Sequence, residues 1–309
     1  ETNESSLCNG TKRNAPSLFE NRRRASPRLH TAPTPRAMVA RAMDVAPGIT
    51  AEDVVFVSNT VLYLALAFFV LNRIVCPLFA PSFMRKEPFL LAFELTCFVP
   101  LAYCAFVGTY GWLYDLEDGY DTAWARLHTP IPMSSRKMIL VNCGFQIWDF
   151  FVSFGHGKLS KIEMLLHHSL AAGLAIAGLH MGFGQYYGLF FMGVTETSSL
   201  PLVWVDLGKY YPELSKRLPT MDLLAKAIFA LMFIVVRDVL FIKHSIQLWK
   251  DSFEVLGAGT AKFPAVMYGF MVTNLFFNVL QIAWTELLID GILDVVRGGG
   301  AKDDKAKGE

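Results

Sequence analysis

Two apolar stretches, MILVNCGFQIWDFFVSF at residues 138–154 and IEMLLHHSLAAGLAIAGLHMG at residues 162–182, decide the class of fold. Each approaches the length of about 20 mostly apolar residues that a helix needs to cross a bilayer. The first carries a carboxylic acid, and the second carries two adjacent histidines. Ionisable groups are rare within membrane helices and usually face the interior of a bundle or a wet cavity.

The composition of the whole chain agrees with a membrane protein. Of its 309 residues, 53% are hydrophobic and 18% are charged, and the mean hydropathy is +0.37. Soluble domains carry roughly 25% charged residues. The formal net charge is +1, so no basic face is available for nucleic acid. The five cysteines form no CxxC pair, which argues against a disulfide framework or a zinc module.

Five further apolar stretches flank the first two. We therefore predict an all-α, polytopic membrane protein with about seven transmembrane helices, at 54–78, 89–114, 138–154, 162–182, 186–208, 223–249 and 263–290. The connection between the fourth and fifth stretches is only a few residues long. We expect those two helices to be antiparallel neighbours.

Both ends of the chain differ in composition from the membrane domain at 54–296. Residues 1–53 are rich in Arg and contain no apolar run, which predicts a disordered basic tail or a targeting segment. The tail also resembles an organellar transit peptide, so an organellar membrane is an alternative location. Residues 297–309 form a charged tail in which Lys305 and Lys307 have the spacing of a dilysine retrieval signal.

The orientation follows from the distribution of Lys and Arg in short loops. More of them, including Lys158, Lys161 and Lys209, lie on the side of the C-terminus than on the other side. Because cytosolic loops carry the excess of Lys and Arg, we predict a cytosolic C-terminus and a lumenal N-terminus.

Polar residues recur at helical spacing within the apolar stretches. Residues three or four positions apart share one face of a helix, so five of the seven stretches offer a polar stripe. The stripes are Asn142, Gln146, Asp149 and Ser153; Glu163, His167 and His168; Thr195, Glu196, Ser198 and Ser199; Arg237, Asp238 and His244; and Asn274, Asn278, Gln281 and Thr285. Interhelical hydrogen bonding explains many of them taken singly.

The ionisable members need partners or a task, because a charged group near the membrane centre costs at least ~2.5 kcal/mol. Asp149 and His167 lie at similar depths, where a carboxylate can orient a neutral imidazole that acts as a base or nucleophile. Glu196 and Arg237 lie deeper and can pair. The alternative is that the His–Asp pair serves only as a polar clamp between helices.

Two chemistries do not fit the sequence. A retinal protein needs a Schiff-base Lys in its last helix, and 263–290 contains no Lys. Di-iron desaturases need several His boxes, whereas the apolar region offers only four histidines, His167, His168, His180 and His244. We therefore expect neither a metal site nor a bound cofactor.

The ordered markers resemble the TLC-domain family, which includes ceramide synthases, translocon-associated membrane proteins and smaller lipid-homeostasis proteins. The resemblance spans about residues 54–296. It rests on FQIWDFF with Asp149, EMLLHHSLAAGLA with His167 and His168, VTETSSLPLVWVDLGK with Glu196, FIVVRDVLF with Arg237, and NLFFNVLQIAW with Gln281 and Trp284.

The resemblance implies a six-helix ring around a central cavity for a long acyl chain, usually in the endoplasmic reticulum membrane. In ceramide synthases a His pair helps to move an acyl group from acyl-CoA to a sphingoid amine. If the chain is an enzyme, His167, His168 and Asp149 inherit the catalytic roles. The expected cavity-lining residues are Gln146, Glu163, Thr195, Glu196, Arg237, Asn274, Gln281 and Trp284.

The sequence departs from the synthase pattern at Val194, Thr195 and Glu196, where a second motif with His and Asp would fall. This region resembles the smaller TLC-domain proteins instead. The first hypothesis is therefore a protein that binds or senses long-chain acyl lipids and takes part in membrane lipid homeostasis. The second is a ceramide-synthase-like N-acyltransferase with acyl-CoA as co-substrate. A transporter or assembly factor without a lipid substrate is the third.

As partners we expect membrane lipids or long-chain acyl chains. Formation of a homodimer is a further possibility that the sequence leaves undecided.

Overall fold

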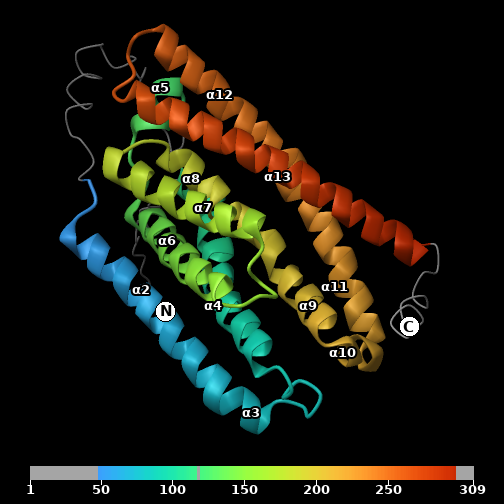
Figure 1. Ribbon diagram of the computed structural model, residues 1–309. Coiled ribbons are helices and arrows are strands. Elements are labelled where there is room, and N and C mark those ends of the chain that lie inside the picture. Colours follow the sequence, from blue (N-terminus) through green and yellow to red (C-terminus); the bar gives the residue numbers. More distant parts are fainter. Residues whose placement is uncertain (1–47, 117–118, 297–309) are drawn as a thin grey trace, which may run out of the picture. The chain divides into compact units, whose positions relative to one another are not determined.

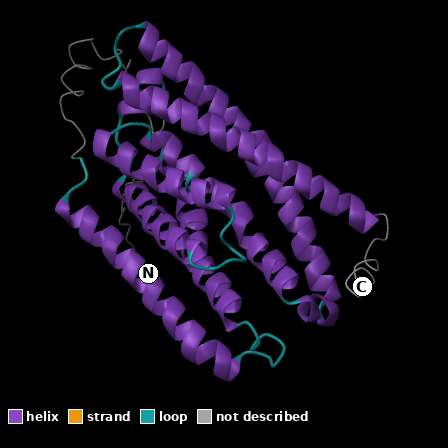
Figure 2. Ribbon diagram, viewed as in Figure 1, coloured by secondary structure: helices purple, strands orange, loops and turns teal. Residues whose placement is uncertain are grey.

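The computed structural model describes residues 48–116 and 119–296, and all regular structure within them is helical (Figures 1 and 2). The expectations for residues 1–47 and 297–309, including the targeting segment and the dilysine pair, lie outside the described residues. The helices are α2 (Ala51–Val70), α3 (Cys76–Phe79), α4 (Pro88–Tyr110), α5 (Ala123–His128), α6 (Met133–Phe154), α7 (Ile162–Met181), α8 (Gln185–Phe191), α9 (Ser199–Tyr210), α10 (Pro212–Arg217), α11 (Pro219–Met232), α12 (Phe241–Gly257) and α13 (Pro264–Val296).

Several of these helices are joined without a loop. A π-helical segment, Leu71–Val75, connects α2 to α3, and another, Gly111–Asp115, extends α4. A longer one, Phe233–Leu240, connects α11 to α12. The short 3-10 segment Val194–Ser198 precedes α9. The predicted single helix at 186–208 is therefore two helices, α8 and α9, with a change of winding between them.

Each predicted apolar stretch is helical, and five of the seven are both long and apolar enough to cross a membrane. These five are Ala51–Phe79, Pro88–Asp115, Ile162–Met181, Gln185–Tyr210 and Pro264–Leu293. The other two correspond to α6 and to α11 with α12, which carry more polar and charged residues. Helix α6 places most of its polar residues inside the bundle, where Asn142, Gln146 and Asp149 are buried. The chain is a polytopic all-α membrane protein.

Helix α6 is central to the packing. It packs against α7, α2 and α4, and in Figure 1 it lies between α2 and α7. The chain reverses after α7 at Gly182 and Gly184, which have φ of +61° and +66°, a left-handed conformation that glycine adopts without strain. Helix α8 then contacts α7, although the most extensive partner of α7 is α6 rather than the following helix.

Glycines allow α4 to approach the 3-10 segment before α9 closely. A Cβ atom added at Gly108 would lie 2.3 Å from Cα of Gly193. Small residues at helix interfaces allow backbones to pack closely within a membrane, where lipid provides no hydrophobic drive between helices. This contact fixes the start of the segment Val194–Ser198, which carries Glu196.

Buried ion pairs fix the ends of two helices. The start of α2 is capped by Thr50 and Asp53, which exchange hydrogen bonds in a capping box, and Asp53 Oδ2 also lies 2.6 Å from Nη2 of Arg136 on α6. At the end of α12, Asp251 accepts bonds from Arg126 Nε at 2.6 Å and Nη2 at 2.8 Å. Asp251 also accepts from Tyr187 and Gln247. This cluster ties α5 and α8 to α12.

Asp251 lies beyond the apolar stretch 223–249, and its partners change its titration. Burial raises the pKa of its carboxyl, but the hydrogen bonds from Arg126, Tyr187 and Gln247 outweigh burial and the pKa is lowered overall. The carboxylate therefore stabilises the fold fully above the ordinary Asp pKa of about 3.9, and this contribution is lost as the pH falls through the lower folded value.

We predict that Asp251→Asn lowers the apparent Tm of the detergent-solubilised protein by several degrees near pH 7, because Arg126 then lacks its counter-ion. The difference in Tm between wild type and variant should become smaller below about pH 4, because Asp251 becomes protonated in the wild type. The control is Glu213→Gln, which removes an exposed pair with Arg217 and should shift Tm little. A gap for Asp251→Asn that stays constant down to pH 3 would contradict this assignment.

Candidate functional site

His168 is held between two side chains of α6. Its Nδ1 lies 2.6 Å from Oε1 of Gln146, and this bond needs the proton on Nδ1 because a carbonyl oxygen only accepts. Its Nε2 lies 3.5 Å from Oδ1 of Asp149. Asp149 Oδ1 also accepts a hydrogen bond of 2.7 Å from Ser153 Oγ. All four side chains are buried, so the imidazole is fixed in orientation beside a carboxylate.

The carboxylate of Asp149 therefore faces His168. The sequence predicts His167 as its neighbour instead, because Asp149 and His167 lie at similar depths in their helices. The ring of His167 contacts Phe277 and Trp284 of α13, with centroids 5.2 Å and 5.6 Å away. Its Nδ1 is buried and has no hydrogen-bond partner within the described residues. The two neighbouring histidines thus differ: His168 donates from Nδ1 to Gln146 and has its Nε2 beside the carboxylate of Asp149, whereas His167 keeps a buried polar atom available to a ligand.

Glu196 and Arg237 lie close together, and Ser199 bridges them. Arg237 donates from Nε to Ser198 Oγ at 2.7 Å and from Nη2 to Ser199 Oγ at 2.9 Å. Ser199 Oγ in turn donates to Glu196 Oε2 at 2.7 Å, and this oxygen lies 3.7 Å from Arg237 Nη2. The 3-10 segment places Glu196 and Ser198, and the π-helical segment Phe233–Leu240 places Arg237 opposite them.

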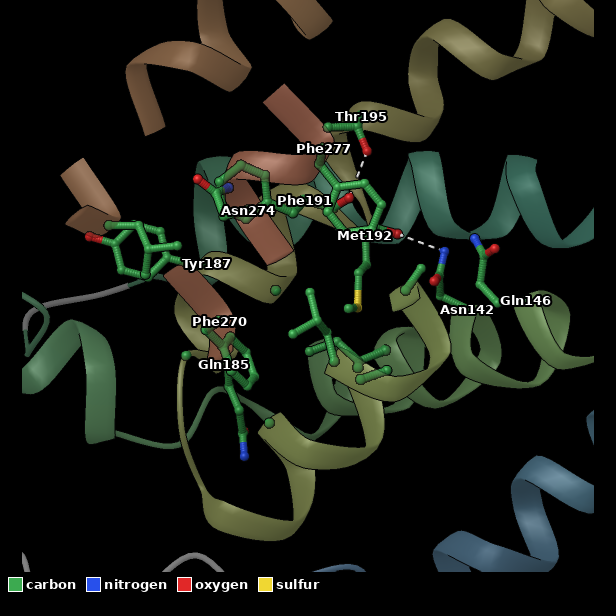
Figure 3. A pocket seen from close by; sticks show the side chains of 18 of the residues that line it. Asn142, Gln146, Gln185, Tyr187, Phe191, Met192, Thr195, Phe270, Asn274 and Phe277 are labelled. Carbon is green, nitrogen blue, oxygen red and sulfur yellow. Dashed lines mark hydrogen bonds between the residues drawn. The ribbon is translucent and has the colours of Figure 1, made fainter. Parts of the chain in front are cut away.

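Two cavities meet at these residues. Cavity 1 has a volume of about 80 Å³ and a mostly apolar lining (Figure 3). Cavity 2 has a volume of about 410 Å³ and a more polar lining, which is within the usual range of roughly 300–1,000 Å³ for ligand sites. Four residues line both cavities: Gln146, His167, Glu196 and Arg237. A polar layer therefore stands between the small cavity 1 and the larger cavity 2, whose lining is mostly apolar but includes charged side chains.

Cavity 1 extends from this layer toward α8. Figure 3 shows Asn142 and Gln146 at one end of the view, and Tyr187 and Gln185 toward the other. Gln281, which is 1% exposed, lines the cavity and its Oε1 has no hydrogen-bond partner among the described residues. The rest of the wall is largely aromatic and aliphatic, including Phe191, Phe270 and Phe277.

Cavity 2 opens at the other end of the same helices. Lys158 and Lys161, in and after the loop between α6 and α7, line it together with Lys209 near the end of α9. His168 and Asp149 line its interior. Its wall also includes Phe229, Phe233 and Leu287 from α11, the π-helical segment and α13. Charged groups at one end and apolar groups along one side fit a molecule with a polar head and an apolar body.

Most of the expected site residues line these cavities. Cavity 1 is lined by Thr195, Asn274 and Gln281, and cavity 2 by Asp149, His168 and Trp284. Asn274 also ties α13 to α12, because its Nδ2 donates to Ser245 Oγ and its Oδ1 accepts from Trp249 Nε1. Glu163 differs, since it lies in the first turn of α7 and lines neither cavity.

The sequence reasoning did not identify Glu94 and Asp206, which also line cavity 2. Glu94 lies in an apolar stretch, PFLLAFELT at 88–96, where a lone ionisable residue in a membrane helix is itself a signal of a functional site. Among the described residues no group of three His, Cys, Asp or Glu side chains is arranged to hold a metal ion.

Comparison with known families gives one informative result. A family model described as the TLC domain matches residues 92–290, which is more than half of the chain. Searches of curated proteins and of solved structures give no significant match. The matched segment includes the four residues of the polar layer between the two cavities: Gln146, His167, Glu196 and Arg237.

We predict that Glu196 and Arg237 are coupled in stability. Glu196→Met or Arg237→Met alone leaves a buried charge without its partner, which costs about 3 kcal/mol or more. The double variant removes both charges and should therefore unfold at a higher temperature than either single variant in detergent. Tm losses that simply add in the double variant would show that the two groups act independently.

Proposed function

Because the chain belongs to the TLC-domain family, we propose that it binds a long-chain acyl lipid in the two cavities and takes part in membrane lipid homeostasis. The observation that carries the proposal is the meeting of a mostly apolar cavity and a larger cavity that also carries charged side chains at one layer of polar residues. The end of an acyl chain would enter the small cavity 1, and the rest of the lipid, with its polar head, would lie in the larger cavity 2.

Unpartnered polar atoms support a ligand at this layer. The Nδ1 of His167 and the Oε1 of Gln281 are buried without hydrogen bonds among the described residues, although a buried polar group without a partner costs about 1–3 kcal/mol. A carbonyl of a bound lipid would accept a hydrogen bond from a protonated His167 Nδ1, and a hydroxyl or amide N–H would donate one to Gln281 Oε1. An amide that joins an acyl chain to its head carries both a carbonyl and an N–H, and an ester carries the carbonyl.

A second candidate activity is acyl transfer, and the setting of His168 favours it. An imidazole held beside a carboxylate is the arrangement that general-base and nucleophilic catalysis need. In this scheme Asp149 and Gln146 orient His168, and the polar layer holds the carbonyl of the acyl group. Acyl-CoA would be the acyl donor and a sphingoid amine the acceptor, as the family resemblance implies.

We also propose the endoplasmic reticulum membrane as the location, with the C-terminus in the cytosol. The support is the excess of Lys and Arg in the loops on the side of the C-terminus, together with the family resemblance. In that orientation cavity 2 faces the cytosol.

We predict that Ala171→Phe at least halves the acyl lipid that co-purifies with the protein, because Ala171 is buried and lines cavity 1. The matched control is Gly173→Phe, two residues along α7, where an added side chain meets open space. Mass spectrometry of lipids extracted from each purified protein gives the comparison. Equal amounts of lipid in wild type and Ala171→Phe would contradict the proposal that the acyl chain of the lipid enters cavity 1.

The same samples decide between binding and acyl transfer. Labelled acyl-CoA and a sphingoid base are added to wild type and to His168→Ala. Label that enters an amide product only with the wild type supports acyl transfer, provided that both proteins have the same melting behaviour. Lipid that is retained without any transfer of label supports binding or sensing.

A further inference from the structure

Cavity 2 contains charged side chains that the polar layer does not use. Glu94 on α4, Asp206 and Lys209 on α9, and Lys161 before α7 all line it. None of these four side chains takes part in a hydrogen bond or ion pair within residues 48–116 and 119–296. The other charged groups on the wall are paired, for example Asp149 with His168 and Glu196 with Arg237.

Glu94 is the most unusual of these groups. It is only 5% exposed and lies within the apolar span Pro88–Asp115. A carboxylate in such a position usually faces a cavity and has a cationic partner. The charges of Asp206 and Asp149 act on it, and of these Asp149 already faces His168. Two carboxylates, Glu94 and Asp206, therefore share the wall of cavity 2, and neither forms an ion pair with a cationic side chain among the described residues.

The lysines nearby do not fill this role. Lys209 acts electrostatically on both Glu94 and Asp206, and Lys161 acts on Asp206, but neither lysine forms an ion pair with either carboxylate among the described residues. Both lysines are exposed, whereas Glu94 is buried and Asp206 is half-buried. The cationic side chains thus stand at the rim of the cavity, and the two carboxylates line its wall further inside.

We propose that Glu94 and Asp206 form a binding site for the ammonium group of an amine-bearing lipid in cavity 2. A carboxylate only accepts hydrogen bonds, and an ammonium group supplies both donors and the opposite charge. Charge-assisted bonds of this kind are about twice as strong as neutral ones. An ammonium partner offsets part of the cost that a buried carboxylate carries alone.

This inference rests on the proposed function, because the acyl chain in cavity 1 brings the head group to cavity 2. The ammonium site adds to that function the chemical class of the lipid's head group. The ammonium group has two sources, a zwitterionic phospholipid or a simple long-chain amine, and both share the same chemistry at Glu94 and Asp206.

The test compares lipids that differ in the ammonium group. The purified full chain in detergent is incubated with an equimolar mixture of phosphatidylethanolamine and phosphatidylglycerol that have identical acyl chains. In a second arm the mixture is a long-chain primary amine and the alcohol of the same length. Native mass spectrometry gives the ratio retained by the wild type, Glu94→Gln, Asp206→Asn and the control Glu163→Gln, which alters a carboxylate outside both cavities.

We expect the wild type and Glu163→Gln to enrich the amine-bearing lipid in at least one arm, and each site variant to lose about tenfold of that enrichment. Enrichment of phosphatidylethanolamine alone identifies a phospholipid, and enrichment of the simple amine shows that the ammonium group suffices. No preference in the wild type, or an unchanged preference in folded Asp206→Asn and Glu94→Gln, would overturn the proposal.

The total lipid load separates the two proposals. Acyl lipid that is retained without head-group preference leaves the proposed function intact and removes only the ammonium site. Absence of any retained acyl lipid removes the proposed function itself. The melting temperature of each variant identifies any that fails to fold, and Glu94→Asp, which keeps the charge, should then retain part of the preference.

Discussion

Polar groups placed inside an apolar bundle must find partners, and the rest of this structure depends on that constraint. In hydrocarbon no water is available to satisfy a buried donor or charge. The chain meets the constraint with short networks between helices: His168 with Gln146 and Asp149, and Arg237 with Ser198 and, through Ser199, with Glu196. These networks join α6 to α7 and the segment before α9 to the one before α12. The same contacts that hold the helices together enclose the polar layer between the cavities.

Much of this could be predicted from the sequence. The apolar stretches predict the helices because the length of a bilayer crossing is fixed. Ionisable residues within them, such as Glu196 and Arg237, predict the polar layer, because such groups are tolerated only when paired or facing a cavity. The spacing of Asn142, Gln146 and Asp149 on one helical face places them in the interior. Glu163 fails this reasoning because it lies in the first turn of its helix, near the membrane boundary, where a charge costs little.

Other features could not be predicted because they depend on contacts between distant segments. The choice of His168 rather than His167 as the neighbour of Asp149 is set by the rotation of α7 against α6, to which the sequence gives no direct guide. The break between α8 and α9 and the π-helical segment before α12 are changes of winding within apolar runs, and no Pro or Gly pattern marks the latter. The cluster of Arg126, Tyr187 and Asp251 joins three separate elements. Glu94 and Asp206 likewise meet only because α4 and α9 pack together.

The central claim is that one lipid occupies both cavities and passes the layer of Gln146, His167, Glu196 and Arg237. Electron cryomicroscopy of the full chain in lipid nanodiscs tests this claim most directly. The account predicts elongated density that runs from cavity 2 past His167 into cavity 1, with a polar group of the ligand near His167 Nδ1. A map of comparable quality in which both cavities contain only side chains and water, while lipid is ordered elsewhere on the surface, would contradict it.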